Sequence, residues 1–206
     1  MTRMRGAFIA NKGGSKAGPI FLFLFLFYVA CFCFGMISLF AMPSWLRERI
    51  LATFQPLVSS MQTHLSSKTF VSTMVFLHAS YGILFLFLIW LLGHLPLKRF
   101  VFLLFLFFRG TVLGALTSGF LVTFGPAALF FVIGAFSLTH LIEESTYLIA
   151  IYFATLFVYH GQGSDKRTSW RYIVYGMVHF LCMNALIFAS WIEPIMIGKC
   201  LYLLPR

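Results

Sequence analysis

The sequence from Phe100 to Phe124 reads FVFLLFLFFRGTVLGALTSGFLVTF, and this stretch decides the fold. It holds a single charged residue, Arg109, close to its middle. About 20 apolar residues in a helix are enough to cross the hydrocarbon core of a bilayer. The stretch therefore predicts a transmembrane helix that carries a guanidinium at mid-membrane depth.

The rest of the chain has the same character, since 61% of its 206 residues are hydrophobic and only 10% are charged. A soluble core could not bury so much apolar surface. We expect an all-α membrane protein, a polytopic bundle of about five transmembrane helices at 20–42, 70–95, 100–124, 126–160 and 170–197. The fourth segment is too long for one straight span and too short for two, which predicts a broken or re-entrant helix.

Four further predictions describe the N-terminal tail, the extent of the domain, the first span and the segment that follows it. Residues 1–18 form a basic tail, and residues 19–200 form one transmembrane domain. No small-residue cleavage site precedes Pro43, so the first span is expected to be an uncleaved anchor. Between the first two spans, residues 44–67 mix apolar and charged side chains at a spacing that favours an amphipathic interfacial helix, with a surface loop as the alternative.

The net charge of +10 comes from basic residues between the apolar runs, a pattern that indicates membrane topology and not nucleic-acid binding. With a single crossing at 126–160, nine Lys and Arg residues lie on the side of the N-terminus and five on the other. With two crossings, the division is eight to six. Cytoplasmic loops are enriched in Lys and Arg. We therefore predict a multi-pass protein of the cell membrane with five spans and a cytoplasmic N-terminus.

Arg109 is the most informative residue, because a guanidinium at the bilayer centre costs at least about 2.5–3.5 kcal/mol. The carboxylates that lie within apolar sequence are Glu143, Glu144 and Glu193. We expect Arg109 to pair with one of them, with Glu144 or Glu193 favoured. Such a pair could fix helix register, or it could belong to a substrate pathway or a catalytic site.

Three glycines on the same span indicate close helix packing. Gly110 and Gly114 form a small-xxx-small pattern that lets another helix approach, and Gly119 extends this surface. These residues place the third span in the centre of the bundle.

The pair Glu143-Glu144 invites comparison with the glutamate-type intramembrane proteases related to CAAX processing enzymes. Their pattern is Glu-Glu-x-x-x-Arg, then Phe-x-x-x-His, then His-x-x-x-Asn. This chain has Leu148 in place of the arginine and Leu156 in place of the phenylalanine, and Met183 lies four residues after a histidine, where the asparagine belongs. The sequence thus predicts no catalytic residue, and an intramembrane protease is the function that it supports least.

The sequence predicts no metal site and no cofactor. The histidines are spread singly over different segments as His64, His78, His94, His140, His160 and His179. His140 is the one that could face Glu143 or Glu144, at a spacing of one helical turn. The four cysteines show neither a disulfide framework nor a zinc pattern.

The order of several motifs resembles the stage II sporulation protein M family. These motifs are LIWLLG at 88–93, FFRGTVLG at 107–114, GFLV at 119–122, the first span's Phe34-Gly35 and SWIEP at 190–194, within a likeness that covers about residues 20–200. The family usually has lysine in the place of Arg109. The resemblance implies a protein without catalytic activity that assembles with the peptidoglycan-degrading stage II sporulation proteins D and P at the septal membrane during engulfment.

Two function classes follow from these observations. The first is a non-enzymatic membrane scaffold that recruits or anchors peptidoglycan hydrolases. The second is a permease or transporter subunit, since intramembrane charges such as Arg109 and the glutamates often mark transport pathways.

Overall fold

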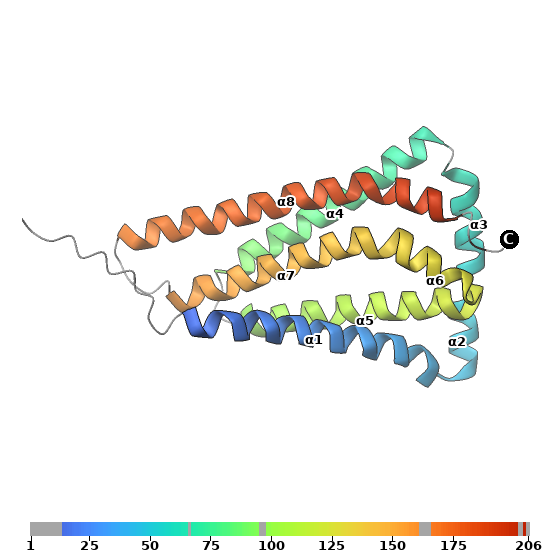
Figure 1. Cartoon of the computed structure of the whole chain (residues 1–206), viewed down its shortest axis with the longest axis horizontal. Coiled ribbons are helices and arrows are strands. Elements are labelled where there is room, and N and C mark those ends of the chain that lie inside the picture. Colours follow the sequence, from blue (N-terminus) through green and yellow to red (C-terminus); the bar gives the residue numbers. More distant parts are fainter. Residues whose placement is uncertain (1–13, 66, 95–97, 161–165, 202–203, 205–206) are drawn as a thin grey trace, which may run out of the picture.

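The computed structural model describes residues 14–65, 67–94, 98–160, 166–201 and 204, and within these ranges every regular element is a helix (Figure 1). Lipid offers the backbone no hydrogen-bond partners, so apolar segments cross it as helices. The elements are α1 (Gly14–Ala41), α2 (Ser44–Leu51), α3 (Phe54–His64), α4 (Lys68–Leu92), α5 (Lys98–Phe124), α6 (Ala127–Phe131), the π-helix η1 (Val132–Phe136), α7 (Ser137–His160) and α8 (Lys166–Cys200).

The predicted fold class is confirmed. Helices α1, α4, α5 and α8 are each long and apolar enough to cross a membrane, and a bent pair made of α6 with α7 adds a fifth candidate span. The long helices run in alternating directions in Figure 1, so α7 returns across the bundle as one passage. The start of α1 and the end of α8 consequently lie at opposite ends of the bundle.

Two local features shape the fourth segment, one at its start and one at its break. Gly125 has a φ of 64°, in the left-handed region that glycine adopts without strain, and Pro126 follows it to begin the short helix α6. The π-helix η1 then separates α6 from α7, and the two apolar halves meet at an angle of 49°. A π-helical turn contains one extra residue, so it changes which face of α7 points inward.

Helices α1 and α5 approach each other most closely where glycines meet. A Cβ on Gly114 would collide with the backbone of Phe32, and a Cβ on Gly35 of α1 would collide with the backbone of Thr111. At Gly110, a Cβ would lie 2.9 Å from the Cβ of Cys31. The small residues therefore hold α5 directly against α1, as small-xxx-small surfaces do in membrane bundles.

The segment between the first two spans forms two short helices, not a loop. Helices α2 and α3 run across one end of the bundle in Figure 1. Phe54 and Val58 are buried, and the ring of Phe54 packs edge-on against Phe120 with centroids 5.0 Å apart. A Cβ on Gly119 would collide with this Phe54 ring, so Gly119 makes room for α3 and not for a second span.

Helices α4 and α5 follow each other in the chain but do not pack closely together. Helix α4 packs on α8 and α7, whereas α5 packs mainly on α1. This arrangement leaves an opening between α4 and α5, and the site described below lies at its floor.

The close approach of α1 and α5 gives a stability prediction. Gly114→Ala should destabilise the protein in detergent by about 1–3 kcal/mol, because the new Cβ forces two backbones apart. Gly176→Ala in α8 is the matched control, since no atom lies within 4 Å of its added Cβ. The control should be neutral or slightly stabilising. Equal melting temperatures for the two variants would contradict this packing.

The orientation in the membrane stays a prediction from the basic residues, and cysteine labelling can test it. In a chain without its four native cysteines, Ser60→Cys on α3 is exposed and should react with an impermeant thiol reagent applied outside the cell. Gln162→Cys, which lies outside the described residues, should be protected. The reverse pattern would place the N-terminus outside.

Candidate functional site

A cluster of charged and titratable side chains lies inside the bundle, centred on Arg109. The guanidinium pairs with two carboxylates of α7: its Nε lies 2.6 Å from Glu144 Oε1, and its Nη2 lies 2.8 Å from Glu143 Oε1. Its central carbon also lies 4.3 Å from the centre of the Tyr147 ring. Two ion pairs and a cation–π contact together offset the cost of placing this charge in lipid.

The arrangement of α7 brings four polar groups to one face of the helix. Each of His140, Glu143, Glu144 and Tyr147 has another member of this set three or four residues away, and residues at that spacing are neighbours on a helix surface. His140 Nδ1 lies 3.1 Å from Glu143 Oε2, which is the contact that the one-turn spacing predicted. Glu143 and Glu144 are both buried.

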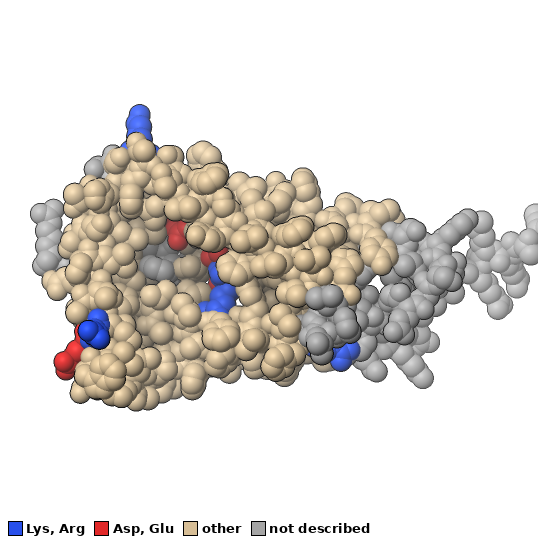
Figure 2. Space-filling view, turned by 180° about the vertical axis from the view of Figure 1, so that it is seen from behind, with Lys and Arg blue, Asp and Glu red and all other residues tan. Residues whose placement is uncertain are grey.

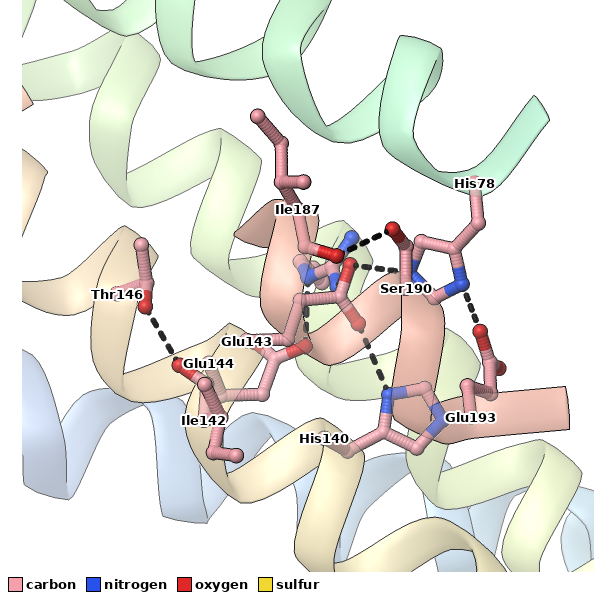
Figure 3. A network of polar contacts seen from close by, with 10 residues as sticks. His78, His140, Ile142, Glu143, Glu144, Thr146, Ile187, Ser190 and Glu193 are labelled. Atoms are coloured by element: carbon pink, nitrogen blue, oxygen red, sulfur yellow. Dashed lines mark hydrogen bonds and ion pairs between the residues drawn. The ribbon is translucent and has the colours of Figure 1, made fainter. Parts of the chain in front are cut away.

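His78 of α4 links this face to α8 (Figure 3). Its Nε2 lies 3.1 Å from Glu143 Oε1, and its Nδ1 forms an ion pair with Glu193. His78 therefore bridges Glu143 of α7 and Glu193 of α8.

The charges of the cluster do not balance without further positive charge. It gathers Glu143, Glu144 and Glu193, which are three of the five acidic residues of the chain, around one guanidinium. The ionised side chains leave a charge of −2 if the histidines are neutral. A buried charge of this size is strongly disfavoured, so protons or a bound cation must compensate it.

Two cavities reach the cluster from different sides. One of about 540 Å³ lies between α4 and α5 and is lined by Phe85, Phe105, Phe108, Arg109, Val112, Leu113, Leu116, His140 and Glu193. Figure 2 shows basic and acidic atoms at the bottom of a hollow in one face of the molecule. The other cavity, of about 280 Å³, is lined by Tyr28, Val29, Phe32, Leu113, Thr117, Val132, His140, Leu141 and Glu144. His140 and Leu113 border both cavities.

The charged residues that were expected to pair from the sequence lie in one network, but their partners differ in part from the predicted ones. Glu144 lies against Arg109, and Glu143 does so as well. Glu193 instead pairs with His78, a partner that sequence reasoning did not assign to it. The signal for His78 was its position well inside an apolar run, where an ionisable group needs a partner.

The remaining histidines lie elsewhere. His179 Nδ1 contacts the Tyr175 carbonyl of its own helix, and His94 Nδ1 contacts the Trp90 carbonyl. His64 packs against Phe70, and the side chain of His160 lies outside the described residues. The histidines that meet the glutamates are His78 and His140, which the protease pattern does not use.

Comparison of the chain with models of protein families, with curated proteins and with solved structures finds no match.

The central ion pairs give a second stability prediction. Arg109→Leu should lower the free energy of unfolding by about 3–5 kcal/mol, because it leaves buried carboxylates without their countercharge. Adding Glu144→Leu should restore part of this loss. Arg49→Leu on the exposed side of α2 is the control and should melt like the unchanged protein. The measurement is thermal unfolding in detergent, and a double variant no better than Arg109→Leu would contradict the pairing.

Proposed function

We propose that the protein is a non-enzymatic scaffold of the cell membrane that holds partner proteins at its surface. The observation that carries this proposal is the polar network around Arg109, whose members lie on α4, α5, α7 and α8 and bind one another. Such a network fixes the relative positions of four helices. A rigid bundle of this kind suits a protein that positions other molecules.

The end of the bundle that carries α2 and α3 offers the surface for partners. These helices bury Phe54 and Val58 against the spans, while Trp45 and Leu57 point outward and are exposed. Arg49 and Glu48 add charge to the same surface. An aromatic side chain surrounded by polar groups is typical of binding surfaces, because it supplies much contact area.

The partner class comes from the sequence resemblance to the stage II sporulation protein M family. By this resemblance, the partners are the peptidoglycan-degrading stage II sporulation proteins D and P. The predicted orientation agrees with the proposal, since it turns α2 and α3 to the extracytoplasmic side, where cell-wall hydrolases work. The scaffold would place the hydrolases at the septal membrane and would not cut the wall itself.

A test of the scaffold compares two exposed positions. Trp45→Ala on the α2–α3 surface should reduce co-purification of the two hydrolases at least tenfold, while the membrane level of the protein stays normal. Phe76→Ala on α4 is the control, because Phe76 is also a large, exposed aromatic residue but lies in a span. Co-purification that is unchanged in Trp45→Ala would remove this surface from the proposal, and no co-purification with the unchanged protein would refute the scaffold.

The absence of catalysis gives a separate prediction. Substituting Glu143, Glu144, His140 or His179 singly should change function only in proportion to protein level and partner binding. A catalytic group behaves differently, since its loss stops turnover while the folded protein remains. Measuring function, abundance and partner binding together distinguishes the two cases. One variant that is abundant and partner-bound yet inactive would indicate an enzyme.

A permease subunit is the second candidate, and the two cavities that meet at His140 favour it. Ionisable residues that border cavities inside a membrane often belong to ion or proton pathways. A co-purifying ATPase, or proton flux through liposomes that contain the protein and its loss in Glu143→Gln, would support this function over the scaffold.

A further inference from the structure

We infer that the cluster binds one divalent transition-metal ion, of the zinc, manganese or iron(II) class, through His140, Glu143 and Glu144. One ligand atom from each of these three side chains lies within 4.8 Å of the other two. A nitrogen and two carboxylate oxygens are a donor set that such ions accept, whereas calcium and magnesium prefer oxygen alone.

The distances within the cluster suit a shared ion. His140 Nδ1 and Glu143 Oε2 are 3.1 Å apart. Two ligands that each lie about 2.0–2.2 Å from a metal, at right angles or at the tetrahedral angle, are about 3–3.5 Å from each other. The two donors therefore have the separation of neighbouring ligands, and an ion between them would replace the proton that their hydrogen bond needs.

Glu144 supplies an independent observation. Its side chain is 9% exposed, and its Oε2 is buried without a hydrogen-bond partner, while Oε1 accepts from Arg109. Leaving a carboxylate oxygen buried in this way is costly, and coordination to a cation would remove that cost. Tyr28 of α1 interacts with the same carboxylate, but its hydroxyl does not reach hydrogen-bond geometry with Oε2.

There is also room for an ion and for its remaining ligands. The cavity of about 280 Å³ is lined by Glu144, His140 and Tyr28, so it adjoins two of the three ligands. Water molecules in this cavity could complete the coordination, since a water needs only about 30 Å³.

The charge of the ion matches the deficit of the cluster. Three carboxylates and one guanidinium sum to −2 when the histidines are neutral, and one divalent cation brings this to zero. Arg109 would remain in place as a fixed countercharge to the carboxylates. Protons on the histidines and glutamates are the competing source of positive charge, and direct metal measurement separates the two.

The test uses the full chain, purified in detergent with a tag that contains no histidine and stripped with a chelator. Equilibrium dialysis against micromolar Mn²⁺ or Zn²⁺, followed by elemental analysis, should give about one ion per chain, and the melting temperature should rise with metal concentration. Mn²⁺ is included because thiolates bind it poorly, so the free cysteines do not contribute.

Variants locate the ion. His140→Ala and Glu144→Gln should each weaken binding at least tenfold, whereas the controls His64→Ala and Glu48→Gln, on α3 and α2, should bind as the unchanged protein does. Size-exclusion profiles identify any variant that fails to fold. The number of ions bound by the unchanged protein tests the inference without any variant. Two results would overturn the inference: no bound ion in the unchanged protein, or binding that persists equally in both cluster variants.

Discussion

The structure depends on one constraint, which is that a guanidinium inside a membrane must have its countercharge within the protein. Arg109 lies near the middle of α5, and the carboxylates that neutralise it come from α7. Because Glu143 also contacts His78, and His78 contacts Glu193, the same requirement extends to α4 and α8. Helix α1 is joined differently, through glycines that bring its backbone against α5.

These two kinds of contact suit the physics of lipid. Apolar side chains gain little by leaving lipid tails for a protein interior, so close packing and polar contacts must hold the helices together. Helix α1 is held on α5 by packing between backbones, and α5 is joined to α7, α4 and α8 through the ion cluster. The opening between α4 and α5 remains because these two helices do not pack closely on each other, and its floor is the cluster itself.

The composition predicted the class of fold and the broken fourth segment, because length and hydropathy decide both. The position of Arg109 in an apolar run predicted that it needs a carboxylate, because an unpaired buried charge is costly. The spacing of one helical turn predicted that His140 could face a glutamate. That His78 and Glu193 each need a partner follows from their position in apolar runs, but their pairing with each other could not be predicted, because a span that is apolar on all sides gives no sign of which face points inward. The π-helix η1 adds to this difficulty by rotating α7 through one extra residue.

The pairing of Arg109 with α7 can be measured directly by solid-state NMR of the protein in lipid bilayers. Arginine side chains labelled with ¹⁵N and glutamate carboxyls labelled with ¹³C would be used in Glu48→Gln, which removes the glutamate beside Arg47 and Arg49. The Arg109 ion pairs should give ¹⁵N–¹³C dipolar coupling that corresponds to nitrogen–oxygen contacts within about 4 Å, the range of an ion pair, and Arg109→Leu should remove it. Absence of the coupling in Glu48→Gln, or its persistence after Arg109→Leu is added, would show that Arg109 does not pair with these glutamates.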